Sequence, residues 1–222
     1  MTEGTELNAN FMQTLSAVTD FLEIFHKNGA TLIFRPLHEM NGNWFWFCIN
    51  NDEDDYLLPE EYAKKLWKYI YDYVVIERGI DSLIWEYGPN VSRGTSKGIA
   101  SVMYCYPGDE YCDLVAADWY TGDYSGCEML SIAEEEMKDT GKIFSVSEFG
   151  PGTLLRDNGF TCINLDRIIR ECIDEDIKFA YWLLWSSWGE VTISMWNMGE
   201  AKTFYENDMY LTLNDTFKLL YE

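Results

Sequence analysis

The sequence predicts an α/β fold in which parallel strands alternate with helices. Short apolar runs, typical of buried strands, occur at residues 31–34, 82–85, 114–117, 143–146 and 179–184. Between them, apolar residues recur at helical spacing in residues 59–77, 125–140 and 166–174. Near-continuous apolar strands joined by helices form parallel sheets that are covered on both faces, so we expect a barrel or a doubly wound sheet.

The segments that follow the predicted strands are polar and aromatic. In chain order the strands run into RPLHEMNGNW (35–44), WEYGPN (85–90), DWY (118–120), SEFG (147–150) and WSSW (185–188). None of them is a G-x-G-x-x-G or P-loop sequence, which disfavours the nucleotide-binding versions of such folds. In a parallel barrel all these ends open on one face, where active sites are built.

Length and hydrophobic content indicate one globular domain that spans residues 1–222. Of the 222 residues 47% are hydrophobic, which is enough for a buried core. The 16 Lys and Arg stand against 38 Asp and Glu, which gives a formal net charge of -22. Such a charge repels a phosphate backbone, so nucleic acid is not an expected partner.

The six cysteines do not predict a zinc site, because none lies in a C-x-x-C pair. Cys105 and Cys112 could form a disulfide, although we expect most of the cysteines to be buried thiols. No run approaches the about 20 apolar residues of a membrane span, and the opening MTEGTELNAN lacks the pattern of a signal peptide. The protein is then either intracellular or exported by a signal that this sequence does not contain, and we expect the second, an extracellular location.

Glu39 and Glu148 are the candidate catalytic residues, because each lies in a segment that follows a predicted strand. Cleavage of a glycosidic bond requires one carboxylic acid to protonate the leaving oxygen and one carboxylate to attack the anomeric carbon or activate water. Two glutamates at the same rim of a barrel can face each other across a bound sugar. A carboxyl separation of about 5.5 Å would predict retention of configuration, and roughly 6.5–9.5 Å would predict inversion.

Aromatic residues and a histidine accompany these glutamates in the sequence. Trp44, Trp119 and Trp185 lie where a strand meets a loop, and we expect Trp44 and Trp185 to contact a sugar ring. Trp67 lies in a helical stretch and is expected in the core. His38 precedes Glu39 and is expected to hydrogen-bond a carboxylate and keep it ionised. An H-E-x-x-H zinc motif is excluded because position 42 is glycine.

The same segments resemble glycoside hydrolase family 26, a group of mainly endo-β-1,4-mannanases with a TIM-barrel fold. FRPLHEMNGNWFW (34–46) is similar to the acid/base motif of that family, and SEFG (147–150) is similar to its nucleophile strand. YPGD (106–109), followed by residues 115–120, resembles the region of the family's sixth strand. The order and spacing of these motifs agree with the family pattern from about residue 10 onward.

The resemblance implies a hydrolase that cleaves β-1,4-mannan, galactomannan or glucomannan internally. It implies Glu39 as acid/base at the end of strand four and Glu148 as nucleophile at the end of strand seven. The mechanism is then a retaining double displacement. We expect neither a metal ion nor an organic cofactor, because proton transfer and nucleophilic attack are both within reach of carboxylates.

The resemblance also implies roles for five residues around the two glutamates. His38 and Tyr120 are expected to hydrogen-bond near the nucleophile, and Asp118 is expected to help order the site. Trp44 and Trp185 are expected to line the sugar subsite at the point of cleavage.

Two features depart from the family pattern. Ser186 and Ser187 follow Trp185, where the family often has arginine or asparagine, so the subsite preference is open. If residues 31–34 are strand four, only one helix, at residues 11–27, precedes them, and about five of eight βα units remain. The sequence therefore predicts an incomplete (β/α)8 barrel, limited to strands four to eight, with unpaired edges. We expect weak or absent activity from this chain alone, with self-association or a separate N-terminal segment completing the barrel.

Three alternatives remain open. The same machinery could act on another β-glucan or on a β-xylan. The shortened chain could be a carbohydrate-binding protein without catalytic activity. An unrelated α/β domain is the third, but the strand-end glutamates and their tryptophan-rich neighbours would then coincide by chance.

Overall fold

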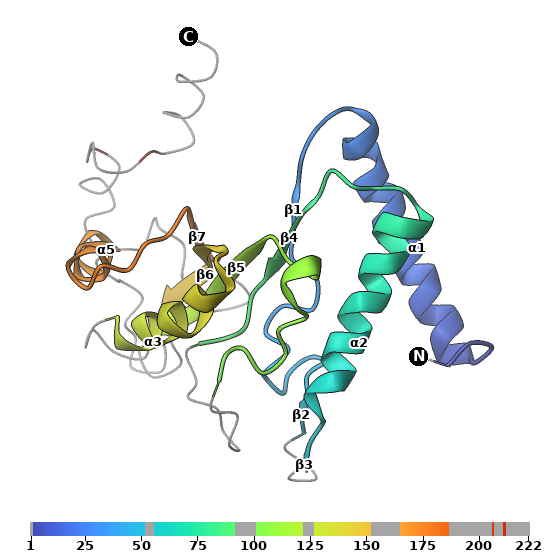
Figure 1. Cartoon of the computed structure of the whole chain (residues 1–222), viewed down its shortest axis with the longest axis horizontal. Coiled ribbons are helices and arrows are strands. Elements are labelled where there is room, and N and C mark those ends of the chain that lie inside the picture. Colours follow the sequence, from blue (N-terminus) through green and yellow to red (C-terminus); the bar gives the residue numbers. More distant parts are fainter. Residues whose placement is uncertain are drawn as a thin grey trace.

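A computed structural model of the chain describes residues 2–51, 56–91, 101–121, 127–151 and 165–186, together with residues 206 and 211. Its main sheet contains the strands β1 (Ile33–Phe34), β4 (Ile84–Tyr87), β5 (Leu114–Thr121), β6 (Ile143–Pro151) and β7 (Trp182–Leu184). The strands lie in chain order, and all neighbours are parallel. The sheet is curled like part of a barrel (Figure 1), with β1 and β7 as its edges within the described residues. The prediction of an incomplete α/β barrel is confirmed.

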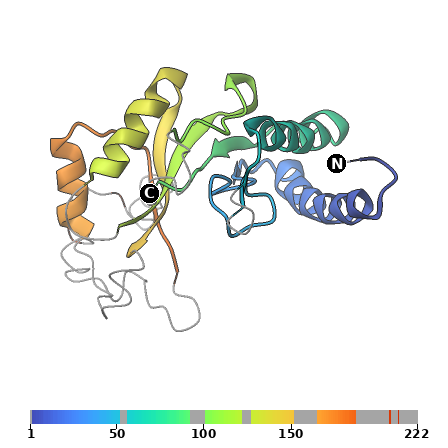
Figure 2. The same cartoon turned by 90° about the horizontal axis from the view of Figure 1, so that it is seen from below.

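Helices lie between the strands, as expected for βα units. Helix α1 (Glu6–Lys27) precedes β1, α2 (Glu60–Tyr71) follows it, and α3 (Glu128–Met137) and α5 (Leu165–Asp174) flank β6 in the chain. Figures 1 and 2 both show α1 and α2 side by side at the β1 end of the sheet. The Tyr69 hydroxyl donates to Met12 Sδ at 3.0 Å across this contact.

Several boundaries differ from the predicted ones. Helix α1 begins before residue 11, because the Thr5 side chain caps it by accepting a hydrogen bond from the backbone N–H of Asn8 at 3.2 Å. The helix predicted at residues 59–77 continues from α2 into a π-helix, Asp72–Glu77. Strands β5 and β6 extend beyond their apolar runs into the segments that carry the candidate site residues. Residues 125 and 126 of the third predicted helix lie outside the described part of the chain.

Three short elements were not predicted. The strands β2 (Asn50–Asn51) and β3 (Tyr56–Leu57) form a separate antiparallel pair, and a 3-10 helix spans Asp109–Tyr111. Each element has only two or three residues, which is too few to show an apolar periodicity.

The core lies between the strands and the helices that cover them. Trp67 of α2 is fully buried, and its ring centroid lies 6.1 Å from that of Trp85 and 6.2 Å from that of Tyr87 on β4. The prediction that Trp67 belongs to the core is therefore confirmed. Among the described cysteines, Cys105 and Cys112 are buried free thiols and do not form the disulfide that was considered.

The remaining cysteines follow the same pattern where the structure describes them. Cys48, Cys127 and Cys172 are also buried free thiols, as expected, and Cys162 lies outside the described residues. None of the helices in the described residues is both long and apolar enough to span a membrane.

Helix α1 carries two apolar stripes that lie next to each other on its surface. One stripe, which includes Leu15 and Leu22, is buried against the rest of the chain. The other is exposed and is made of Leu7, Val18, Phe21 and Ile24, with exposed fractions of 79%, 39%, 57% and 59%. We call this second set the outer stripe of α1. A helix in a globular protein usually buries one apolar stripe, so the outer stripe requires a separate explanation.

Candidate active site

Glu39 lies in the loop after β1 and points into the carboxyl end of the sheet. Its backbone has φ +53°, and that of Leu37 has φ +52°, a left-handed conformation that non-glycine residues adopt only when the surrounding structure stabilises it. The Glu39 N–H donates to Gly88 O at 2.8 Å, and the Gly42 N–H donates to Glu39 O at 2.8 Å. These bonds fix the turn, which leaves the Glu39 side chain 7% exposed.

A β-bulge brings Asp118 and Glu148 together on neighbouring strands. The pairing of β5 with β6 shifts by one residue after Ala117, so that Asp118 pairs with Glu148 and Ser147 is the extra residue. Consecutive strand residues normally point to opposite faces, but a bulge redirects a side chain. Ser147 Oγ therefore donates to Asp118 Oδ1 at 2.6 Å, while Glu148 also reaches the site.

Arg35 joins the carboxylates of this site. Its Nη1 lies 2.5 Å from Asp118 Oδ2, its Nη2 lies 2.5 Å from Glu148 Oε1, and its Nε lies 3.8 Å from Glu86 Oε1. Buried carboxylates require such charge-paired hydrogen bonds. Gly88 makes room for this arginine, because a Cβ there would lie 2.9 Å from Arg35 Cδ.

Sequence reasoning did not assign a role to Arg35, to Glu86 or to Asn90. All three lie in strand-end segments that were singled out for their polar residues, and an arginine among so many acids was an available signal. Glu86 is 1% exposed and accepts a hydrogen bond from the Tyr181 hydroxyl. Burial raises the pKa of Glu86, against the opposing effects of Tyr181 and Arg35.

The carboxyl group of Glu39 sits between two N–H donors. Asn90 Nδ2 donates to Glu39 Oε1 at 2.6 Å, and Trp44 Nε1 donates to Glu39 Oε2 at 2.7 Å. Burial raises the pKa of Glu39, and the negative charge of Glu148 acts in the same direction, while both N–H donors and Arg35 oppose the rise. A buried carboxylic acid with a raised pKa is the form expected of a general acid.

Tyr120 and His38 lie on the Glu148 side of the site. The Tyr120 hydroxyl donates to Glu148 Oε2 at 2.7 Å, and burial followed by this bond raises the pKa of Tyr120. His38 Nε2 lies 4.0 Å from Glu148 Oε1, too far for the hydrogen bond that was expected. Burial and Arg35 lower the pKa of His38, which favours its neutral form, and its ring lies 4.8 Å from the ring of Phe45.

The aromatic residues divide into exposed and buried sets. Trp44 is 40% exposed at the site, and Gly42 permits its position because a Cβ there would lie 2.5 Å from the indole ring. Trp185 is half-buried directly after β7. Its backbone N–H donates to the backbone carbonyl of Phe149, the residue after Glu148, at 3.0 Å. Trp119, by contrast, is 3% exposed and belongs to the core.

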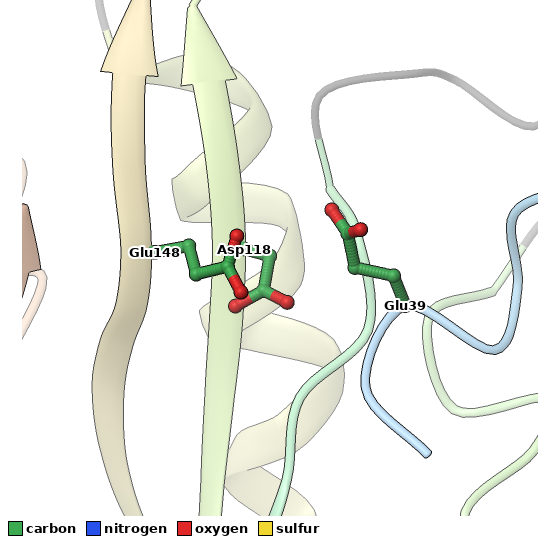
Figure 3. A group of neighbouring side chains, drawn as sticks. All are labelled: Glu39, Asp118 and Glu148. Carbon is green, nitrogen blue, oxygen red and sulfur yellow. The ribbon is translucent and has the colours of Figure 1, made fainter. Parts of the chain in front are cut away.

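One carboxylate oxygen from each of Glu39, Asp118 and Glu148 lies within 4.8 Å of one from each of the other two. Figure 3 shows Asp118 and Glu148 on neighbouring strands, with Glu39 facing them from the loop after β1. Clustered carboxylates can attract a cation, but here Arg35 already donates to two of them and both oxygens of Glu39 accept N–H groups. This arrangement fits acid/base and nucleophilic chemistry better than metal coordination.

Comparisons with known proteins agree with this geometry. The family model of glycosyl hydrolase family 26 matches residues 1–216. A mannan endo-1,4-beta-mannosidase of Bacillus subtilis (strain 168) is 32% identical over 182 residues, which are 81% of this chain and 45% of that protein. A second mannan endo-1,4-beta-mannosidase, from Bacillus subtilis, is 31% identical over 94% of this chain and 52% of its own length.

Solved structures give the same result. The structure of the Bacillus subtilis mannanase BCman matches with a TM-score of 0.68 at 30% identity, over 91% of this chain and 55% of that one. The chain therefore spans about half the length of the relatives that it matches.

Proposed function

This chain belongs to glycosyl hydrolase family 26, and we propose that it carries the catalytic machinery of a retaining, endo-acting glycoside hydrolase that cleaves β-1,4-mannan. The observation that carries the proposal is the approach of Glu39 and Glu148, because one carboxylate oxygen of Glu39 lies within 4.8 Å of one of Glu148. Retaining enzymes separate their two carboxyl groups by about 5–5.5 Å, whereas inverting enzymes need more room for a water molecule.

The two glutamates would act in two steps. In the first, the Glu39 carboxyl protonates the glycosidic oxygen while a Glu148 oxygen attacks the anomeric carbon, so that the glycosidic bond breaks and a glycosyl ester forms. In the second, Glu39 takes a proton from water, which attacks the same carbon and releases the Glu148 carboxylate. Retention follows because two inversions occur at one carbon.

The hydrogen bonds of the site support this division of roles. Glu148 accepts from Arg35 Nη2 and from the Tyr120 hydroxyl, which stabilises a carboxylate that attacks rather than donates a proton. Glu39 instead meets burial and the charge of Glu148, which favour the protonated acid. Asp118 orders the site by sharing Arg35 with Glu148 and by accepting from Ser147.

The substrate is proposed from the relatives, two of which are named mannan endo-1,4-beta-mannosidases. We expect Trp44 to contact a sugar ring beside Glu39, because it is exposed there, and we expect Trp185 to contact it from the end of β7. Ser186 and Ser187 follow Trp185, and Ser187 lies outside the described residues. The sugar contact that an arginine or asparagine would make at this position is therefore an open part of the proposal.

Activity of this chain alone is expected to be weak or absent. Glu39 lies in the loop after β1 and Glu148 lies on β6, but the relatives have about as much chain again, which could contribute further contacts to the substrate. The outer stripe of α1 and the edge of β1, where Ile33 is 48% exposed, are the surfaces we propose for self-association or for a complementing segment.

The proposal is tested by measuring reducing-sugar release from soluble galactomannan, glucomannan, β-glucan and β-xylan over long incubations, with Glu39→Ala and Glu148→Ala as controls. Release from the mannans that vanishes in both variants supports the proposal. Release from β-glucan or β-xylan alone would change the substrate. Binding without hydrolysis, unaffected by Glu148→Gln, would show a carbohydrate-binding protein instead.

A further inference from the structure

Asn41 lies two residues after Glu39 and is buried, with 9% of its surface exposed. Its side chain makes two hydrogen bonds to the backbone of one residue. Asn41 Nδ2 donates to Asn90 O at 2.7 Å, and Asn41 Oδ1 accepts from the Asn90 N–H at 2.9 Å. The amide is thus oriented by both of its ends, and it fixes the position of Asn90 rather than that of a carboxylate.

These two bonds continue a β-ladder. On one side, the Asp118 N–H donates to Pro89 O at 3.0 Å and the Val91 N–H donates to Asp118 O at 2.9 Å, which makes Asn90 a parallel bridge partner of Asp118. The N–H and C=O of Asn90 itself then point away from β5, as alternation along a strand requires. The Asn41 side chain satisfies both groups, as the backbone of a neighbouring strand would do.

Asn90 in turn contacts the carboxyl group of Glu39. Asn90 is 7% exposed, and its Nδ2 donates to Glu39 Oε1 at 2.6 Å. This bond favours the ionised form of Glu39 and so limits the rise in pKa that burial produces. The position of the Asn90 amide therefore affects how readily Glu39 gives up and recovers its proton.

The same contacts anchor the backbone that carries Glu39. Its left-handed conformation is tied at two points to residues 88–90, which directly follow β4. One point is the bond from the Glu39 N–H to Gly88 O, and the other is the pair of bonds between Asn41 and Asn90. Residues 39–41 and 88–90 thus form one hydrogen-bonded unit.

We infer that Asn41 is a positioning residue for the proposed acid/base Glu39, and that it acts through Asn90. The Asn41 side chain bonds to the Asn90 backbone on the side that faces away from β5, and this fixes the Asn90 side chain where its Nδ2 donates to Glu39 Oε1. The mechanistic meaning rests on the proposed function, but the coupling among these three residues is a property of the folded chain and is measured without substrate.

The test is a pH titration of Glu39 in the 222-residue chain, followed by the NMR signal of its ¹³C-labelled side-chain carboxyl and assigned with Glu39→Gln. The variants are Asn41→Ala, Asn90→Ala and the double variant. Asn43→Ala is the matched control, because Asn43 is an exposed asparagine in the same loop. The other charged or titratable groups around Glu39, which are Arg35, Cys48, Asp118, Tyr120 and Glu148, stay unchanged in every variant.

The titration midpoint of Glu39 is expected to move to higher pH in Asn90→Ala and also in Asn41→Ala. The double variant should show the shift of Asn90→Ala and no more, because residues that act in series are not additive. Asn43→Ala should not move the midpoint. If Asn41→Ala does not fold, Asn41→Ser makes the same comparison, since one hydroxyl cannot satisfy both backbone groups of Asn90.

Three results would overturn the inference. One is a midpoint that Asn41→Ala leaves unchanged while the variant loses stability, which would make Asn41 merely structural. Another is a double variant whose shift equals the sum of the two single shifts. The third is an unchanged midpoint in Asn90→Ala. Because no turnover is measured, an inactive chain would contradict the proposed function without affecting this result.

Discussion

The carboxyl end of the sheet and the outer stripe of α1 are opposite in character. At the carboxyl end, Arg35, Glu39, Asp118 and Glu148 are buried or nearly so, and each is hydrogen-bonded. On the outer stripe, apolar side chains such as Phe21 are exposed. The difference teaches that the five strands of the described sheet are enough to bring the two proposed catalytic carboxylates together, while the outer stripe of α1 stays uncovered by the described residues.

The largest expected effects come from the carboxyl end and are on rate. Glu39→Gln and Glu148→Gln should each reduce any activity by roughly 10²–10⁴-fold, because each removes a group that we propose to act on the glycosidic bond. An aryl β-mannoside with a good leaving group should reduce the loss in Glu39→Gln, since that group leaves without a proton, but not the loss in Glu148→Gln. Phe21→Ala is the control for the outer stripe and should not change the rate at a protein concentration at which the parent is monomeric by sedimentation. A rate equal to that of the parent in either glutamine variant would show that the substituted glutamate is not needed for activity, and the carboxyl end would then not differ from the outer stripe in this respect.

Arg35→Met should have the next largest effect, on stability. It leaves Asp118 and Glu148 without their shared cation, and breaking such a buried pair costs about 3–5 kcal/mol. Burial raises the pKa of Asp118 and Glu86, so the deficit relative to the parent should shrink as pH falls and these groups become neutral. Urea denaturation from pH 4 to pH 8 measures this. Arg78→Met, which removes the partly exposed ion pair with Asp20, is the matched control and should lower the free energy of unfolding far less. An equal loss in both variants would show that burial of the Arg35 ion pairs does not increase their contribution to stability.

Leu22 and Phe21 are adjacent on α1 and test the other region. Leu22 is 4% exposed, so Leu22→Ala should lower the free energy of unfolding by about 2–5 kcal/mol. Phe21 is 57% exposed, so Phe21→Ala should change it by less than about 0.5 kcal/mol. Equal losses in thermal or urea unfolding would mean that the outer stripe is covered in solution, and sedimentation at several protein concentrations would then show whether a second copy covers it.

The smallest expected effect is the pH dependence that Glu39 adds to stability. Its pKa is raised in the folded chain from the ordinary value of 4.5, so its contribution is fully present below about pH 4.5 and is lost as pH rises through the folded pKa. The unfolding free energy of Glu39→Gln minus that of the parent should therefore increase as pH rises from 4 to 8. A difference that is flat, or that falls with rising pH, would mean that the carboxyl is not held in an environment that favours its proton.

The sequence was sufficient to predict where the main strands lie and that Glu39 and Glu148 approach each other, because buried parallel strands are apolar and their carboxyl ends meet at one face. It did not reveal Arg35 or Asn90 as partners, since their contacts depend on how strands far apart in the chain are placed. The extra residue Ser147 illustrates this limit, because a bulge leaves no periodic signal in the sequence. His38 shows the same limit. The sequence places it next to Glu39 and suggested a hydrogen bond to a carboxylate, but the distance of 4.0 Å from His38 Nε2 to Glu148 Oε1 depends on the fold.

The most direct test of the account is to trap the glycosyl-enzyme with an activated mannosyl fluoride that carries a second fluorine at C2, which slows release. The Glu148 oxygen would displace fluoride from the anomeric carbon, and peptide mass mapping would locate the sugar. We expect the label on Glu148, its loss in Glu148→Gln, and its persistence in Glu39→Gln, because fluoride leaves without an acid. A label on Glu39 or on another peptide, or one that persists in Glu148→Gln, would contradict the assignment of the nucleophile.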